Sequence, residues 1–258
     1  MNFAASGWLQ HSKCDDCAIH NRSICGAENA IAAQELERIS RTRLVPAGQT
    51  IISENSEIAF VGNVVKGVLK LSKTLEDGRQ QIVGLLFPSD FFGRIYQERS
   101  QFSFEAASDV EICVFDRAAF EALLARHPDV EHEILLQILD ELDAVREWLV
   151  VLGCQNAEEK VAGFLLMLLR RTAYRGCSRG DYGAKTIVQF PINRKDIAMF
   201  LGTTLETISR KLQQMSREGV LRIIDGQHFE ILDAERLSKI AGHDEWLRDH
   251  TAQLDRTV

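Results

Sequence analysis

Cysteine is the residue type whose pattern in this sequence most directly suggests chemistry. Three cysteines near the start of the chain have the spacing C-x2-C-x7-C, and a fourth lies in VEICVF: Cys14, Cys17, Cys25 and Cys113. Thiolates are soft ligands that suit zinc or iron–sulfur clusters, and both commonly take four of them. His11 and His20 offer zinc a nitrogen ligand instead. Spacing alone therefore leaves three interpretations open, namely a cluster, a zinc site or unliganded thiols.

The composition is that of an ordinary globular protein. Six cysteines in 258 residues do not make a disulfide scaffold, so clustered thiols point to metal or redox chemistry. The longest wholly apolar run, Phe164 to Leu169, is too short to span a bilayer, and the N-terminus lacks the features of a secretion signal. We expect a cytoplasmic protein with no membrane partner. The absence of a nucleophile–base constellation, P-loop or paired catalytic carboxylates argues against an enzyme.

The formal net charge of −7 conceals a basic segment. Between Lys160 and Arg222 there are twelve Lys and Arg residues against four Asp and Glu residues, so the rest of the chain is strongly acidic. A basic segment inside an acidic protein is typical of a module that binds a polyanion. A solvated basic face would have the same composition.

Within this segment, Pro191 to Leu221 has the pattern of two short helices joined by a tight turn. Asn193 is a candidate N-cap for the first helix, Gly202 ends it, and Thr203 begins the second. The residues predicted to face inward on the first helix are Ile197, Met199, Phe200 and Leu201. Those predicted to be buried on the second are Leu205, Ile208, Leu212 and Met215.

Polar side chains early in the second helix fit the docking geometry of a helix-turn-helix, with the following hairpin as a wing. Arg210 can donate two hydrogen bonds to guanine, Glu206 can accept from cytosine and Ser209 can contact thymine. Glu206 also forms T-x-x-E with Thr203, a capping box that would explain it without DNA. The remaining residues assigned to DNA binding are Thr203, Thr204, Arg194 and Lys211, of which the basic pair would position phosphates or be solvated charges.

The upstream sequence predicts a β-rich unit followed by a long helix. From about Arg43 to Phe115, short runs are separated by turn residues, and VLKLSK and QQIVGLLF flank Asp77-Gly78 as hairpin strands would. We predict a roll or barrel, then helices over Asp116 to His127 and after Pro128.

An apolar seam with heptad spacing marks this second helix: Leu135, Ile138, Leu142, Val145, Leu149 and Leu152. The opposite face is acidic, with Asp140, Glu141, Asp143 and Glu147. The regular seam favours contact between two copies of the chain, and a helix docked on its own domain is the alternative.

These features resemble the Crp/Fnr family of regulators. ETISR (206–210) is similar to the recognition-helix core of FNR-type members, and NAEEK, RRTAYRG, VVKGVLKLSK and FPSDFFG extend the resemblance over nearly the whole chain. The resemblance implies an α+β fold with an N-terminal cyclic-nucleotide-binding-like β-roll, a long dimerisation helix and a C-terminal winged helix-turn-helix. The expected parts are a cluster-binding arm (1–30), the β-roll (31–127), the dimerisation helix (128–158), the DNA-binding domain (159–245) and a tail (246–258).

The FNR-type, FnrN/FnrL-like members imply an oxygen-sensing activator with a [4Fe-4S] cluster on the four cysteines named above. Glu206 and Arg210 would read a G·C pair and Ser209 a neighbouring T, in inverted-repeat DNA like TTGAT–ATCAA. The partners would be a second copy of the chain, double-stranded DNA and RNA polymerase, and oxygen would act on the cluster and weaken the dimer. The alternative is a regulator of this fold with structural zinc or redox-active thiols. Cys154 and Cys177 match no ligand position.

The sequence departs from the family pattern at two places. Arg94 follows Gly93 where cyclic-nucleotide-binding members have Glu, and Glu105 lies where a phosphate-binding Arg is expected. A carboxylate there would repel a cyclic phosphate, so we expect no cyclic nucleotide.

Val145 stands where FNR has a negative residue that keeps the two copies of the cluster-free protein apart. Repulsion would then come from flanking acidic residues, or this protein dimerises more readily without the cluster.

Overall fold

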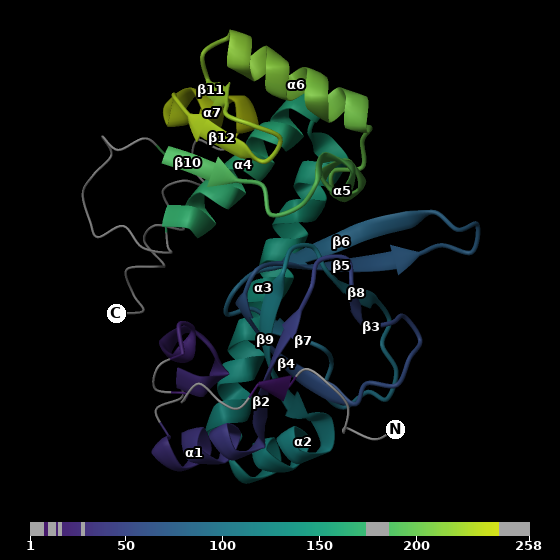
Figure 1. Ribbon diagram of the computed structural model, residues 1–258, viewed down its shortest axis with the longest axis vertical. Coiled ribbons are helices and arrows are strands. Elements are labelled where there is room, and N and C mark those ends of the chain that lie inside the picture. The colour runs from purple at the N-terminus through teal and green to yellow at the C-terminus, as the bar shows by residue number, and fades with distance from the viewer. Residues whose placement is uncertain (1–7, 10–13, 15–16, 27–28, 174–185, 243–258) are drawn as a thin grey trace. The chain divides into compact units, whose positions relative to one another are not determined.

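The computed structural model describes residues 8–9, 14, 17–26, 29–173 and 186–242 (Figure 1). His11, Cys177 and the predicted tail lie outside the described residues. The chain divides into two compact units, residues 1–143 and 144–258, and each is considered by itself. None of the described helices has the length and apolarity needed to cross a membrane.

Unit 1 contains a β-roll made of two antiparallel sheets (Figure 1). The first sheet has the order β1 (Trp8–Leu9), β2 (Ser40–Val45), β9 (Val110–Asp116), β4 (Phe60–Lys66) and β7 (Phe91–Phe92). The second has the order β3 (Thr50–Ile52), β8 (Ser103–Ala106), β5 (Leu69–Thr74) and β6 (Gln80–Leu86). The predicted hairpin is confirmed, because Thr74 pairs with Gln80 and Gly78 takes the left-handed conformation that the turn requires.

The two faces of the first sheet pack into different cores because successive side chains of a strand point to opposite sides. Val64, Ile112 and Val114 belong to the core between the sheets. Val61 and Phe115 belong to a second core, which Cys113 also contacts. This second core is covered by α1 (Ala30–Ile39), α2 (Arg117–Arg126) and the beginning of α3 (Pro128–Cys154), whose buried contributions include Leu36, Phe120, Val130 and Ile134.

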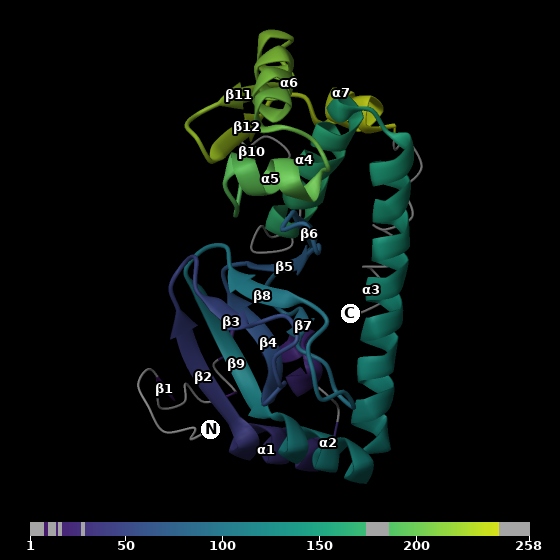
Figure 2. The ribbon, with the colours of Figure 1, turned by 90° about the vertical axis from the view of Figure 1, so that its right-hand side faces the viewer.

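The helices α1 and α2 and the beginning of α3 lie next to one another in Figure 2, and polar contacts join them. Asn29 caps α1 by accepting hydrogen bonds from the backbone of Ile31 and Ala32, and its amide donates to Asp129 in the first turn of α3 at 2.9 Å. Glu35 of α1 forms an ion pair with Arg126 of α2 at 2.6 Å. The sequence predicted α2 and α3, and both are confirmed, whereas α1 had not been predicted.

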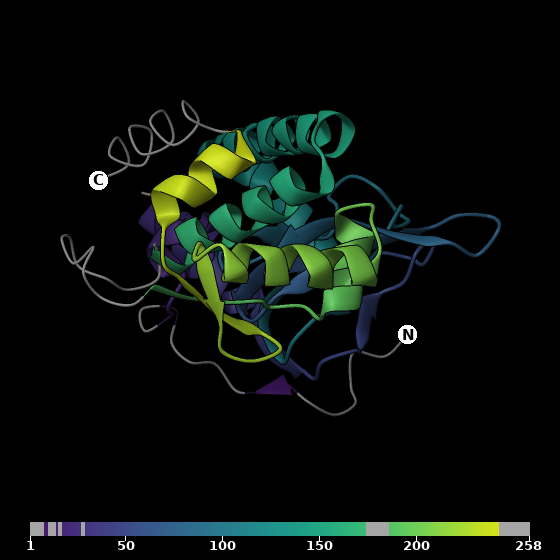
Figure 3. The ribbon, with the colours of Figure 1, turned by 90° about the horizontal axis from the view of Figure 1, so that it is seen from above.

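Unit 2 contains the predicted winged helix-turn-helix, seen from above in Figure 3. Its elements are α4 (Ala157–Ala173), β10 (Thr186–Gln189), α5 (Arg194–Phe200), α6 (Leu205–Arg217), β11 (Leu221–Ile223), β12 (His228–Ile231) and α7 (Ala234–Ala241). The strands form one antiparallel sheet in the order β10-β12-β11, and β11 and β12 are the predicted hairpin. Aromatic rings fill the core, with Phe164 against Phe190 and Phe200, and Trp148 stacked on Phe200.

Candidate thiol centre and nucleic-acid interface

Three of the four predicted cysteines lie on an arm that packs against the second core of unit 1. Short 3₁₀ turns at His20–Arg22 and Ile24–Gly26 fold this arm, and backbone hydrogen bonds from Cys17 to Cys14 and from His20 to Cys17 close it further. Ile24 is 2% exposed and anchors the arm in the core, while the backbone N–H of Cys14 donates to Glu37 of α1 at 3.4 Å. The arm is therefore attached at both its first and its last cysteine.

Cys113, the fourth cysteine, lies in the middle of β9. Its Cα partners are Thr42 on β2 and Asn63 on β4, so hydrogen-bonded strands flank it on both sides. Cys25 and Cys113 are both half-buried against the core that also holds Ile24. The position of Cys113 is fixed by the sheet, and the arm brings the other thiols toward it.

The electrostatics place all four thiols within range of one another. Burial, together with the like charges of Cys25, Cys14 and Cys17, raises the pKa of Cys113 to about 12, against the opposing effect of a side-chain hydrogen bond with Ser40. Burial, with smaller contributions from Cys14 and Cys17, raises the pKa of Cys25 to about 11 against the opposing hydrogen bond with Ser23. The four cysteines that the sequence singled out therefore lie within range of one another's charge.

Four thiols are, by their chemistry, the donor set of a Cys₄ metal centre. Neighbouring buried thiolates are unfavourable by themselves, and a bound metal centre supplies the positive charge that allows them to ionise. Among the described residues, no group of three or more His, Cys, Asp and Glu side chains is arranged to hold a metal ion as the structure stands. Cys154 is exposed at the end of α3.

The second candidate site is the N-terminal end of α6. Its N-cap is Thr204, whose hydroxyl accepts a hydrogen bond from the backbone N–H of Thr207 at 3.2 Å. The predicted start at Thr203 is therefore wrong by one residue. The capping box of Thr203 with Glu206, which was the alternative to base contact, does not form because Thr204 is the N-cap. Glu206 and Arg210 are exposed and Ser209 is partly exposed.

The buried stripe of α6 also differs from the prediction at one position. Ile208, Leu212 and Met215 are fully buried, but Leu205 is 49% exposed because it is the first residue of the helix. In α5 the N-cap Asn193 is confirmed by its hydrogen bond from the backbone of Asp196 at 2.9 Å. Met199, predicted to face inward, is only partly buried.

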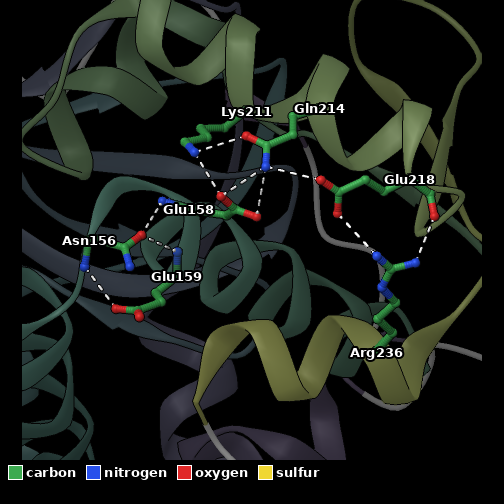
Figure 4. Close-up of polar contacts among 7 residues, drawn as sticks. All are labelled: Asn156, Glu158, Glu159, Lys211, Gln214, Glu218 and Arg236. Atoms are coloured by element: carbon green, nitrogen blue, oxygen red, sulfur yellow. Dashed lines mark hydrogen bonds and ion pairs between the residues drawn. The ribbon is translucent and has the colours of Figure 1, made fainter.

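Lys211 points toward α4 and not freely into solvent (Figure 4). Its Nζ donates to Glu158 at 2.7 Å and to Gln214 at 2.9 Å, and Gln214 also donates to Glu158. Glu158 lies in the first turn of α4, which begins with a reciprocal capping box between Asn156 and Glu159. The motif NAEEK entered the sequence analysis only through the family resemblance, and its local pattern gives no sign that Glu158 contacts α6.

A second link joins the end of α6 to α7 (Figure 4). Arg236 donates to the backbone carbonyl of Glu218 at 2.8 Å and to its carboxylate at 3.2 Å, and Gln214 donates to Glu218 at 3.1 Å. The polar network therefore runs from α4 through α6 to α7 and fixes the orientation of α6.

The other residues assigned to DNA are placed as follows. The backbone N–H of Thr203 donates to the carbonyl of Ala198 at 2.9 Å and closes the turn between the two helices. Arg194 is the first residue of α5 and is partly buried. DNA contact by Thr203, Thr204, Arg194 and Lys211 stays a prediction.

In the β-roll, the positions that depart from the cyclic-nucleotide pattern have structural partners. Glu105 forms an ion pair with Lys70 on the neighbouring strand at 2.9 Å. The Ser103 hydroxyl accepts a hydrogen bond from the backbone of Glu54 at 3.0 Å. That the roll binds no cyclic nucleotide also stays a prediction.

Comparison with known proteins identifies the fold and the family. Residues 42–127 match the cyclic nucleotide-binding domain, and residues 159–240 match the Crp-like helix-turn-helix domain. The chain is 39% identical over 232 residues to the transcriptional activator protein FnrL of Cereibacter sphaeroides, which covers 90% of this chain and 93% of that protein. The chain belongs to the Crp/Fnr family of transcriptional regulators.

Other members of the Crp/Fnr family support the assignment. The nitrogen fixation regulation protein FixK of Bradyrhizobium diazoefficiens is 36% identical over 228 residues, which is 88% of this chain and 93% of that protein. The structure of FixK2 from Bradyrhizobium japonicum is similar to this one, with a TM-score of 0.70 and 27% sequence identity. The match covers 78% of this chain and 97% of the FixK2 chain. The helix-turn-helix match includes α5 and α6, so α6 is the recognition helix of a DNA-binding regulator.

We predict that the metal-free protein loses stability at alkaline pH. A thiol whose pKa is higher in the folded than in the unfolded state stabilises the fold below its unfolded pKa, and this contribution is lost as the pH rises through the folded pKa. For Cys113 the window runs from 9.0 to about 12. Denaturant unfolding should show that the free energy of unfolding falls less between about pH 8 and about pH 10.5 for Cys113→Ser than for the wild type. An equal fall in both proteins would contradict the raised pKa of Cys113.

We also predict that Lys211 acts by positioning α6. Lys211→Met should weaken operator binding about tenfold, roughly the worth of one charge-assisted hydrogen bond, but leave the salt dependence of binding unchanged. Loss of a true phosphate contact would reduce the slope of log K against log salt by about 0.9. Glu158→Gln should reproduce the effect of Lys211→Met, with exposed Lys195→Met as the matched control. A reduced slope for Lys211→Met would show phosphate contact instead.

Proposed function

We propose that this Crp/Fnr regulator is a cytoplasmic oxygen sensor that holds a [4Fe-4S] cluster on Cys14, Cys17, Cys25 and Cys113. The observation that supports the proposal is that Cys25 of the arm and Cys113 of the central strand pack against one core, with Cys14 and Cys17 within range of their charge, in a chain with a helix-turn-helix. Relatives that are named FnrL and fumarate and nitrate reduction regulatory protein support it. When bound, the cluster supplies an oxygen-labile connection between the arm and β9.

The chain's own residues would convert the state of this centre into a change at α3. Ile24, next to Cys25, shares a core with Val130 and Ile134 of α3. Asn29, just after the arm, donates to Asp129 in the first turn of the same helix. An arm held in place by its thiolates therefore keeps the start of α3 in its packed position, and a released arm removes part of that packing.

We propose α3 as the dimerisation helix. Five of its seam residues are 41–62% exposed, so this chain alone does not bury them: Leu135, Ile138, Leu142, Val145 and Leu149. Leu152 is partly buried. A second copy would cover the seam in a two-stranded contact. Because two recognition helices must reach half-sites one DNA turn apart, association controls DNA affinity.

In the dimer, the exposed side chains of α6 would read the operator. Arg210 and Glu206 are available for a G·C pair, and Ser209 for a neighbouring thymine. We propose an inverted-repeat operator of the TTGAT–ATCAA type and, because a relative is named a transcriptional activator, contact with RNA polymerase.

One observation favours a second candidate, a regulator of the same fold with a zinc site. Nδ1 of His20 on the arm is buried without a hydrogen-bond partner, and a neutral imidazole nitrogen is a common zinc ligand. The experiment that tests the cluster also tests this alternative.

Protein purified without air should be coloured and contain about four iron and four sulfide per chain. Cys113→Ser should lose both, since it removes the thiol fixed by the sheet. Cys154→Ser, a matched substitution at an exposed cysteine, should retain both. Colourless wild-type protein that contains zinc would replace the proposed function with the second candidate.

The dimer proposal is tested by size-exclusion chromatography with and without air, together with operator binding. The anaerobic protein should be a dimer, and air should lower both dimer content and DNA affinity. Val145→Glu adds a charge to the exposed seam and should leave the anaerobic protein largely monomeric. Ala144→Glu adds the same charge outside the seam and should stay dimeric. Identical profiles and affinities in both atmospheres would rule out regulation by dissociation.

A further inference from the structure

Asn63 carries a buried amide for which the structure provides no partner. Its side chain is 0% exposed, and neither Nδ2 nor Oδ1 has a hydrogen bond. Burying an amide without hydrogen bonds is unfavourable, and an apolar residue of similar volume would avoid this cost. A polar residue at such a position therefore calls for an explanation in terms of function.

The register of the sheet places Asn63 beside the thiol centre. Asn63 is the Cα partner of Cys113 on β9 and of Phe91 on β7. Directly opposite residues of antiparallel strands project to the same face, with Cβ atoms about 4.5–5.5 Å apart. The amide therefore lies between the Cys113 side chain and the Phe91 ring.

The same face is the one that the arm covers. Val61, two residues before Asn63, belongs to the core that contains Ile24, and Cys25 packs against that core. Val64, the next residue along β4, points into the other core. Asn63 is thus directed to the side of the sheet where the thiols gather.

A nearby polar residue shows what a satisfied group looks like here. The Ser40 hydroxyl donates its one proton to the carbonyl of Glu37 at 3.0 Å. Asn63 has no such backbone partner, although its NH₂ group offers two donors. Its surroundings lack an acceptor for the NH₂ group as well as a donor for Oδ1, and a bound sulfur would supply the acceptor.

We propose that the Asn63 amide is an outer-shell hydrogen-bond donor to the sulfur of the bound centre at Cys113. The inference rests on the proposed function and assigns it a residue besides the four ligands. Hydrogen bonds to cluster sulfurs tune reduction potential, and outer-shell partners commonly change metal affinity about 10- to 100-fold. The donor stabilises the more negative, reduced state, and so raises the potential.

Asn63→Leu separates this role from simple packing. The metal-free variant should unfold at a higher denaturant concentration than the metal-free wild type, because an unsatisfied polar group has been removed. The loaded variant should lose iron to a chelator about tenfold faster under anaerobic conditions, and its reduction potential should fall. Stability and cluster retention therefore move in opposite directions.

Val64→Ala is the matched control, because it destabilises the same strand from the opposite face. It should lower stability while leaving iron loss and potential per loaded cluster near wild type. If Asn63→Leu does not fold, Asn63→Ala is measured in the same way, with iron loss and potential compared to Val64→Ala.

Three outcomes separate the two proposals. Iron loss and potential at wild-type values in the Asn63 variant would overturn the outer-shell role. Stability and cluster retention that fall together, as for a packing residue, would also overturn it. Wild-type protein that binds no iron and sulfide would instead refute the proposed function, on which this inference rests.

Discussion

The structure of unit 1 depends on one constraint, which is the fixed position of Cys113 in the central strand of a sheet. β9 is hydrogen-bonded to β2 on one side and to β4 on the other, so this thiol has little freedom to move. The start of the arm pairs with β2 through β1, but the described residues from Cys14 to Cys25 form no strand and are held by Ile24 in the core and by the contact between Cys14 and Glu37. A centre that joins the two therefore fixes the less constrained segment to the more constrained one.

This arrangement offers a route by which a change at the arm would reach the proposed dimer seam. The arm, α1 and the first turns of α3 pack on one core, and Asn29 connects the end of the arm to Asp129. Close-packed cores transmit displacements because they contain few voids in which a shift could be absorbed. The exposed seam begins at Leu135, directly after Ile134 of that core. A small change in the arm thus acts where the two copies would first meet.

Much of the fold and the candidate site could be predicted from sequence because their signals are local or periodic. The hairpin at Gly78, the helix after Pro128 and the cap at Asn193 follow from turn chemistry and spacing. The start of α6 was misplaced by one residue because Thr203 and Thr204 are equally good caps, and only the tertiary turn selects between them. The links of Glu158 to Lys211 and of Asn63 to Cys113 join residues distant in sequence, and no local pattern encodes them.

Unit 2 shows why a count of basic residues does not define a DNA-binding surface. Within the basic segment, Lys211 is neutralised by Glu158, and Arg222 by Glu230 at 2.9 Å. The first pair holds α6 and the second joins β11 to β12 in the wing. Fewer unpaired positive charges are then available for DNA phosphates than the composition suggests. Glu206, by contrast, is left exposed because Thr204 takes over the cap. The capacity to read bases therefore depends on which side chains the internal contacts leave unoccupied at the start of α6, more than on the net charge of the segment.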